Sequence, residues 1–306
     1  MASFVEDVRE MAKGWRWTRR PLVPRSAEPF QPEYEKPEFP TEWARTDAAR
    51  AARDLFHRAI LKPVVFGETS VEVGGLDNLE RLKGPVMFVS NHSSHIDASL
   101  ILSSLPPKWR DRVAVGAAAD YFFDAWWKSV STAFVYNAFP IDRSKRGAAI
   151  STARRLIEEG WSLVVFPEGT RSRDGWMQRF RHGSARLCIE TQIPAVPIGI
   201  RGASAAYPTG NRWIRAGRLP VSIRFGEAIT PEEGEDHRGF SRRMTQGVAR
   251  LIDEDKTTWF EAVQREARGE TPLPSGPEGP KWQRIWEGSR PLARRGSRRA
   301  WGPTAK

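Results

Sequence analysis

The fold prediction starts from residues 86–97, which read Val86-Met87-Phe88-Val89-Ser90-Asn91-His92-Ser93-Ser94-His95-Ile96-Asp97. The first four residues form a short apolar run after Gly84-Pro85, a pattern that is typical of a buried strand. The polar residues therefore lie where this strand ends. Asp97 opens the apolar run 98–102, which predicts a helix with Asp97 as a candidate cap for its free N–H groups.

His92 and Asp97 form a candidate acid–base pair at this strand end. If Asp97 accepts a hydrogen bond from one ring nitrogen of His92, it orients the ring and stabilises the imidazolium that forms on proton uptake. The other nitrogen can then act as a base on a hydroxyl of the substrate.

Two other interpretations of this pair stay open. In one, Ser93 or Ser94 is a nucleophile in a Ser-His-Asp arrangement. That arrangement is disfavoured because both serines directly follow the histidine, and because the chain contains no Gly-x-Ser-x-Gly motif. In the other, the pair is structural and Asp97 only caps a helix.

Length and composition favour a globular protein. The chain has 306 residues, of which 40% are hydrophobic, enough for a substantial core in one large or two smaller domains. A mean hydropathy of -0.53 and the lack of any run of 18 apolar residues argue against an integral membrane protein. Residues 1–7 lack the pattern of a signal peptide, so we expect a cytosolic chain.

The charge and the tryptophans together indicate a partner. A formal net charge of +11 favours polyanions, meaning nucleic acid or an anionic lipid surface. Tryptophan is enriched at membrane interfaces, and several of the 13 tryptophans lie beside basic residues within 13–20, 281–286 and 298–301. No nucleic-acid-binding motif appears. We therefore expect peripheral contact with an anionic membrane, at the cytoplasmic face of the cell membrane, and no nucleic-acid partner.

Strand patterns alternate with helix patterns along the middle of the chain. Predicted strands lie at 70–73, 86–89, 112–116, 161–166, 195–200 and 221–225, and predicted helices lie at 46–62, 98–102, 121–127, 148–159, 185–189, 241–253 and 259–267. Pro63 is expected to end the first of these helices. The alternation predicts a single α/β domain with a central, mostly parallel sheet flanked by helices.

The two ends of the chain differ from this domain in composition. Residues 1–45 combine a helical pattern with a proline-rich connector and predict a membrane-associating segment. Residues 46–268 form the predicted α/β domain. The segment 269–306 is rich in proline, glycine and basic residues and predicts a structureless tail that makes a second membrane contact.

Three polar clusters follow apolar stretches of the chain, and we expect them at the strand ends where open α/β sheets bind ligands. They are His92 with Asp97, the arginine that ends Phe139-Pro140-Ile141-Asp142-Arg143, and Glu168-Gly169-Thr170-Arg171. Two arginines that converge on one opening suit a phosphate, because each guanidinium can donate two hydrogen bonds to it.

Four blocks of sequence resemble the glycerolipid acyltransferase family in order and spacing. They are the His-x4-Asp of His92 and Asp97, Phe-Pro-Ile-Asp-Arg at 139–143, Phe-Pro-Glu-Gly-Thr-Arg-Ser at 166–172 and Ile-Pro-Ala-Val-Pro-Ile at 193–198. Over residues 64 to about 230 the chain looks like a lysophospholipid acyltransferase, the group that contains 1-acylglycerol-3-phosphate acyltransferase. Asn137 departs from the glycine usual before the second block, but asparagine tolerates a positive φ.

The resemblance implies a role for each matching residue. His92 would be the general base and Asp97 its orienting partner. The acceptor site would contain Arg143, Glu168, Gly169, Thr170 and Arg171, with the arginines on the phosphate. Pro197 would belong to the acyl-CoA side or to the architecture of the site. No metal and no cofactor are implied, since acyl-CoA is a co-substrate.

The implied reaction is acyl transfer from acyl-CoA to a glycerol hydroxyl of a lysophospholipid, without a covalent enzyme intermediate. The first expectation for the acceptor is 1-acylglycerol-3-phosphate, which gives phosphatidic acid in phospholipid biosynthesis. Glycerol-3-phosphate and a glycolipid are alternative acceptors. A catalytically silent membrane-binding protein is the alternative from another class.

Overall fold

The computed structural model describes residues 40–119, 126–141, 146–208, 211 and 213–292. Chain contacts divide the protein into residues 1–38 and residues 39–306, and the account below concerns the second unit. The predicted N-terminal membrane helix and nearly all of the proline-rich connector lie outside the described residues.

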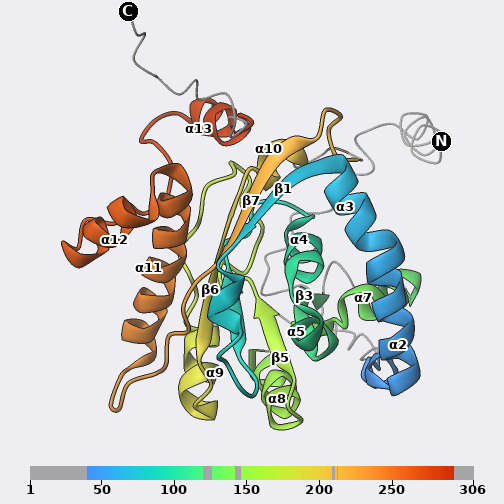
Figure 1. Ribbon diagram of the computed structural model, residues 1–306. Helices are drawn as coiled ribbons and strands as arrows, with labels where there is room; N and C mark the ends of the chain where they lie inside the picture. The colour runs from blue at the N-terminus through green and yellow to red at the C-terminus, as the bar shows by residue number, and fades with distance from the viewer. Residues whose placement is uncertain (1–39, 120–125, 142–145, 209–210, 212, 293–306) are drawn as a thin grey trace, which may run out of the picture. The chain divides into compact units, whose positions relative to one another are not determined.

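A seven-stranded sheet forms the centre of the domain, in the order β1-β7-β6-β2-β5-β3-β4 (Figure 1). All neighbouring strands pair in parallel except β6 and β7, which pair antiparallel. The predicted α/β fold with a mostly parallel sheet is therefore confirmed. The strands are β1 (Thr69–Gly74), β2 (Met87–Ser90), β3 (Val113–Ala118), β4 (Phe139–Ile141), β5 (Ser162–Val165), β6 (Ala195–Arg201) and β7 (Leu219–Phe225).

Helices cover both faces of the sheet (Figure 1). The described α-helices are α2 (Asp47–Phe56), α3 (Lys62–Glu68), α4 (Asp97–Ser104), α5 (Pro107–Asp111), α7 (Trp126–Tyr136), α8 (Arg146–Glu158), α9 (Gly183–Thr191), α10 (Ala203–Ala206), α11 (His237–Lys256), α12 (Trp259–Ala267) and α13 (Lys281–Gly288). A π-helical turn, η3 (His57–Leu61), and two 3-10 turns, η2 (Glu42–Arg45) and η4 (Leu76–Leu79), complete the set.

Strand β2 shows how one short run builds two cores. Phe88 packs with α4 and α5 on one face, whereas Met87 and Val89 pack with α8, α9 and α11 on the other. Successive side chains of a strand point to opposite faces, so a strand that is covered on both faces buries all of its residues. This explains why the whole of β2 is buried.

The first described long helix continues past Pro63, so the predicted stop at this proline is wrong. Helix α2 passes through η3 into α3, and Pro63 lies in the first turn of α3. Proline lacks an N–H and its ring clashes with the carbonyl four residues earlier in a regular helix. The π-helical turn at His57–Leu61 is a bulge that interrupts the regular ladder just before the proline.

The segment after Gly269 is also more structured than predicted. Residues 281–288 form α13, and residues 274–292 pack on the loop that follows β5. The prediction of a structureless segment is therefore wrong for this part of the tail. Residues 293–306 lie outside the described part, and the predicted membrane role of the tail stays a prediction.

Candidate active site

The candidate site lies where β2 and β5 end. These strands are parallel neighbours, with Phe88 opposite Val164, so their carboxyl ends meet at one edge of the sheet. The loop at 91–96 leaves β2 and the loop at 166–172 leaves β5. The predicted cluster that ends at Arg143 follows β4, but Arg143 lies outside the described residues. Before β4, Asn137 has φ 46° and its amide donates to Val113 O at 3.0 Å, as expected of a residue in the turn.

Asn91 fixes the start of the first loop. Its side-chain Oδ1 accepts from Ile200 N at 2.9 Å and its Nδ2 donates to Ile200 O at 2.9 Å. The amide thus continues the backbone pairing between β2 and β6 by one more residue. Sequence reasoning did not assign a role to Asn91. A buried amide that directly ends a hydrophobic strand was the available signal.

His92 and Asp97 are in contact, as predicted. His92 Nδ1 lies 2.9 Å from Asp97 Oδ2. The same oxygen accepts from Ser93 N at 2.7 Å and from Ser94 N at 2.8 Å. The carboxylate is completely buried and therefore held in one position, while the His92 side chain keeps 22% of its surface exposed.

The role of Asp97 as a helix cap is wrong. Asp97 is the first residue of α4, and the residue in the capping position is Ile96, which makes no side-chain cap. The carboxylate instead turns back onto the N–H groups of the preceding loop, which rigidifies the turn that carries His92. The hydroxyl of Ser94 donates to Tyr207 O at 2.8 Å, so Ser94 does not complete a Ser-His-Asp arrangement.

Phe166 supports the imidazole from the second loop. The rings of His92 and Phe166 are stacked, with their centroids 4.1 Å apart and their planes 21° from parallel. One edge of the imidazole is held by Asp97 and one face by Phe166. Nδ1 faces the carboxylate, which leaves Nε2 to accept a proton.

Glu168 ties the two loops together through the backbone of His92. Glu168 Oε1 accepts from His92 N at 2.8 Å, and Ser172 N donates to His92 O at 2.8 Å. Both backbone groups of His92 are therefore held by the loop after β5. The geometry gives Glu168 a positioning contact, whereas the predicted contact with the acceptor stays a prediction.

The environment of Glu168 favours its neutral form. Burial raises the pKa of this carboxyl to about 8, and the nearby carboxylates of Asp97 and Asp174 act in the same direction. Hydrogen bonds from the backbone N–H groups of His92 and Gln178 oppose this shift. Oε2 is buried and has no hydrogen-bond partner among the residues that the structure describes.

Gly169 lets a guanidinium approach the second loop closely. Its φ is +76°, and a Cβ at this position would lie 2.7–3.0 Å from the Arg181 side chain. Both features favour glycine. The Arg181 backbone N–H donates to Pro167 O at 2.8 Å, which holds Arg181 beside the loop. Sequence analysis did not place this cation at the site.

Arg171 is half-buried next to the histidines, and Thr170 beside it is also half-buried. Burial lowers the pKa of His95 to about 4, and the nearby positive charge of Arg171 acts in the same direction. Arg171 Nη1 is buried and has no hydrogen-bond partner within the described part of the chain. A buried donor of this kind is costly unless it is satisfied, so Arg171 is suited to an anionic ligand.

Pro197 lies inside β6, and its ring packs against Gly226 and Gly247. A Cβ on Gly226 would lie 2.8 Å from this ring, and a Cβ on Gly247 would lie 3.1 Å from it. Pro197 O accepts from Gly226 N at 2.8 Å. These contacts favour the architectural role over the predicted acyl-CoA contact, which stays a prediction.

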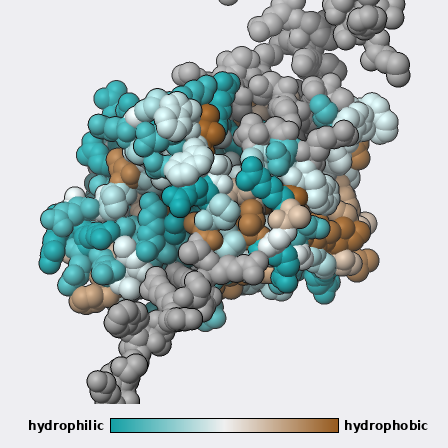
Figure 2. All heavy atoms as spheres, turned by 90° about the horizontal axis from the view of Figure 1, so that it is seen from above, coloured by the Kyte–Doolittle hydropathy of each residue, from teal (hydrophilic) through white to brown (hydrophobic). Residues whose placement is uncertain are grey.

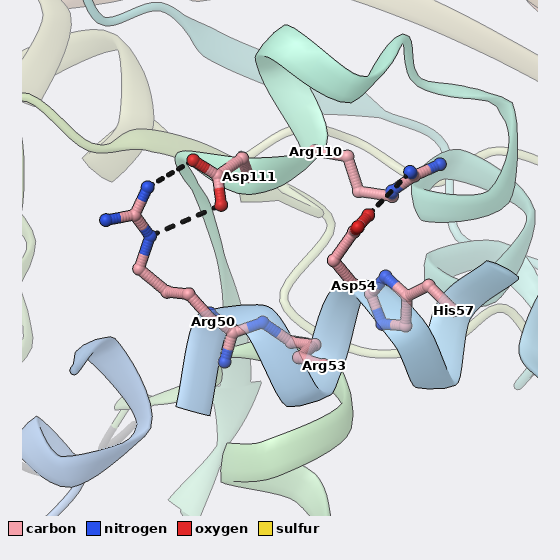
Figure 3. Close-up of a pocket in the computed structure, with 6 residues that line it drawn as sticks. All are labelled: Arg50, Arg53, Asp54, His57, Arg110 and Asp111. Carbon is pink, nitrogen blue, oxygen red and sulfur yellow. Dashed lines mark hydrogen bonds and ion pairs between the residues drawn. The ribbon is translucent and has the colours of Figure 1, made fainter. Parts of the chain in front are cut away.

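A second group of charged residues lies between α2, η3 and α5 (Figure 3). Asp111 pairs with Arg50, and Asp54 pairs with Arg110 at 2.8 Å. Both carboxylates are thus engaged by arginines, and the cluster ties α2 to α5. The residues that line this pocket are Arg50, Arg53, Asp54, His57, Arg110 and Asp111.

Comparison with known proteins supports the motif assignment. The model of the Acyltransferase family matches residues 70–201. The 1-acyl-sn-glycerol-3-phosphate acyltransferase of Limnanthes douglasii is 29% identical over 159 residues, which cover 50% of this chain and 53% of the plant protein. The 1-acyl-sn-glycerol-3-phosphate acyltransferase alpha of Bos taurus is 30% identical over 194 residues, which cover 60% of this chain and 61% of the bovine protein.

The fold has a counterpart among solved structures. The crystal structure of the 1-acyl-sn-glycerophosphate (LPA) acyltransferase PlsC from Thermotoga maritima aligns with a TM-score of 0.56 at 23% identity. The alignment covers 72% of this chain and 84% of the Thermotoga chain. By contrast, this chain spans only about half the length of plant relatives such as the Limnanthes protein, at 53%.

Proposed function

This chain belongs to the acyltransferase family, as its motifs predict, and from this premise we propose that it transfers an acyl group from acyl-CoA to a glycerol hydroxyl of a lysophospholipid. The first candidate for the acceptor is 1-acylglycerol-3-phosphate, which would give phosphatidic acid. The observation that carries this proposal is the contact of 2.9 Å between His92 Nδ1 and the buried Asp97 carboxylate. It provides a base at the end of the strand where ligands bind in this class of fold.

In the proposed reaction, His92 Nε2 takes the proton of the glycerol hydroxyl while the hydroxyl oxygen attacks the thioester carbonyl. Asp97 stabilises the imidazolium that forms. When the tetrahedral intermediate collapses, the carbon–sulfur bond breaks and the imidazolium returns its proton to the departing CoA thiolate. No covalent bond to the enzyme forms, which agrees with the engagement of Ser94 by Tyr207 O.

The phosphate of the acceptor would bind to Arg171. Nη1 of this half-buried side chain has no hydrogen-bond partner among the residues covered by the structure, and a phosphate oxygen would satisfy it. The Arg181 side chain packs against Gly169 and adds a second cation beside the same loop. Arg143 stays the predicted further contact to the phosphate, outside the described residues.

A panel of acceptors tests this function. Purified protein is incubated with palmitoyl-CoA or oleoyl-CoA and 1-acylglycerol-3-phosphate, glycerol-3-phosphate, a lysophospholipid with a larger head group, or an unphosphorylated glycolipid, and release of the CoA thiol is followed. We expect activity on a phosphorylated acceptor and a loss of roughly 10²-fold or more in His92→Ala. Activity confined to unphosphorylated alcohols would remove the role of Arg171. Equal activity of His92→Ala and the wild type would show that His92 is not the base.

We also propose that the enzyme contacts the cytoplasmic face of the cell membrane peripherally. No helix in the described ranges combines the length and apolar character needed to cross a bilayer. Apolar side chains are nevertheless exposed on α2, η3, α3 and α7, on the side where Figure 2 shows brown surface at the right-hand edge. They include Leu55, Ile60, Val64, Trp126, Trp127 and Val130.

Helix α13 is a second candidate contact. Trp282, Ile285 and Trp286 are all exposed and recur at helical spacing, as is typical of helices that lie in an interface. Flotation with anionic vesicles should weaken in the pair Trp126→Ser and Trp127→Ser, or in the pair Trp282→Ser and Trp286→Ser. The matched control is Trp259→Ser on α12, which is similarly exposed. If neither pair weakens flotation more than the control does, these surfaces do not bind the membrane.

A further inference from the structure

The C-terminal segment covers the loop that continues the Glu168–Arg171 block. Residues 172–177 follow this block directly, and residues 274–292 lie against them. Met177 N donates to Pro274 O at 3.0 Å, and Trp176 Nε1 donates to Arg284 O at 3.0 Å. Helix α13 also contacts α10, where Ser204 Oγ donates to Gly288 O at 2.8 Å (Figure 1).

An ion pair between Asp174 and Arg284 is the centre of this contact. Arg284 Nη2 lies 2.8 Å and Nε 2.9 Å from the same oxygen, Asp174 Oδ2. The guanidinium also donates to Pro277 O at 2.8 Å and to Ser275 O at 2.7 Å. Every nitrogen of Arg284 therefore has an acceptor, and the side chain holds the tail and the loop together.

Two glycines of the tail permit a very close approach. A Cβ on Gly288 would lie 1.9 Å from Asp174 O, and a Cβ on Gly276 would lie 2.6–2.8 Å from the Trp176 ring. Side chains at these positions would push the tail off the loop. Glycines in this segment predict a flexible tail in the sequence, but in the structure they allow the tail to pack closely on the loop.

The ion pair connects to the backbone of His92 in two steps. Asp174 Oδ1 accepts from Ser172 Oγ at 3.0 Å, and Ser172 N donates to His92 O at 2.8 Å. Partial burial alone would raise the pKa of Asp174, but hydrogen bonds from Arg284, Trp176 N and Ser172 lower it below its ordinary value. The carboxylate is thus ionised and engaged on both oxygens.

We propose that residues 274–292 are a structural part of the active site and that Asp174 and Arg284 are positioning residues for the loop that carries Glu168 and Arg171. The proposal rests on the acyltransferase function proposed above. It gives a role in the site to a segment that lies outside residues 70–201, the part of the chain that matches the family model. Neither residue touches the reacting atoms. They act by restricting the conformations of the loop, so that Arg171 meets the phosphate and Glu168 holds His92.

The experiment uses the full chain with Arg284→Ala, Arg284→Lys and the matched control Arg268→Ala. Arg268 follows α12, is exposed and lies outside residues 274–292. We expect Arg284→Ala to raise KM for the phosphorylated acceptor about tenfold, with a smaller change in kcat. Arg284→Lys should recover part of this loss, and Arg268→Ala should behave like the wild type. Adding Asp174→Asn to Arg284→Ala should cost little more, because the two residues act as a unit.

Amide hydrogen exchange separates this proposal from the proposed function. In Arg284→Ala, the amides of Ser172, Trp176 and Met177 should exchange faster, while the amides of β2 keep their protection. This readout needs no substrate and applies even if the acceptor panel shows no acyl transfer. Protection of these amides equal to that in Arg268→Ala would overturn the proposal. Faster exchange with an unchanged KM on an active enzyme would overturn the positioning role.

Discussion

Replacement of Asp97 by asparagine tests the acid–base pair most directly. The substitution keeps the shape of the side chain and removes its charge. The asparagine Oδ1 can still accept from Ser93 N and Ser94 N, so the turn is retained. Its NH2 group takes the place of an oxygen that is buried and has no hydrogen-bond partner in the described residues. An unsatisfied buried donor costs about 1–3 kcal/mol, so the variant should melt earlier but still fold.

The expected loss of activity follows from the charge. With charge centres about 4 Å apart near a protein surface, a carboxylate stabilises an imidazolium by roughly 4 kcal/mol. Each 1.36 kcal/mol changes a rate tenfold, so kcat should fall by about 10³-fold. KM for the acceptor should change little, because Asp97 interacts with the charge that develops on His92 during the reaction.

The assay is steady-state thiol release at several acceptor concentrations, with the melting temperature of each variant as a measure of folding. Asp77→Asn is the matched control, since Asp77 also lies in the first turn of a short helix but is exposed. The control should keep wild-type kcat. A folded Asp97→Asn enzyme whose kcat stays within about threefold of the wild type would refute the electrostatic reasoning. The loss of ~4 kcal/mol of imidazolium stabilisation requires a much larger fall in kcat.

The remaining predictions concern the second loop. Because burial raises the pKa of Glu168 from 4.5 to about 8, the folded state keeps a proton that the unfolded chain releases, and the free energy of unfolding should fall by a few kcal/mol, in order of magnitude, as pH rises from 4.5 to 8. Glu168→Gln should flatten this part of the pH profile in urea unfolding; an unchanged slope would contradict the shift. Gly169→Ala should lower the unfolding free energy by about 1–2 kcal/mol through its positive φ, and more if Arg181 cannot move aside. Gly67→Ala in α3, where a Cβ meets nothing within 4 Å, should instead be neutral or stabilising by about 0.5–1 kcal/mol, and equal effects of the two changes would contradict the argument.

Local patterns determined much of this protein from the sequence alone. The alternation of strands and helices predicted the fold class because periodicity in hydrophobicity reports which faces are buried. The contact between His92 and Asp97 was also predictable, because both residues lie within one short loop whose geometry depends on a few neighbouring residues. The family motifs located the second loop for the same reason, since each block is contiguous.

Contacts between distant residues required the tertiary structure. His92 N meets Glu168 across 76 positions, Asn91 meets Ile200 across 109, and Arg284 meets Asp174 across 110. These pairings depend on which strands are neighbours in the sheet, and hydrophobic periodicity carries no information about strand order. The prediction of Asp97 as a cap failed for a different, local reason, because its carboxylate accepts from N–H groups of the loop before the helix and not from those within the helix.

The tail illustrates the difference most clearly. Its prolines and glycines predict a structureless segment, because such residues form neither regular helices nor strands and leave little apolar surface to bury. The structure shows residues 274–292 packed on the loop after β5, with glycines where any side chain would collide. The sequence by itself predicted most of the strands and helices and the contact between His92 and Asp97. Only the tertiary structure decided which loops meet at His92, because the shape of the partner surface exists only once the chain has folded.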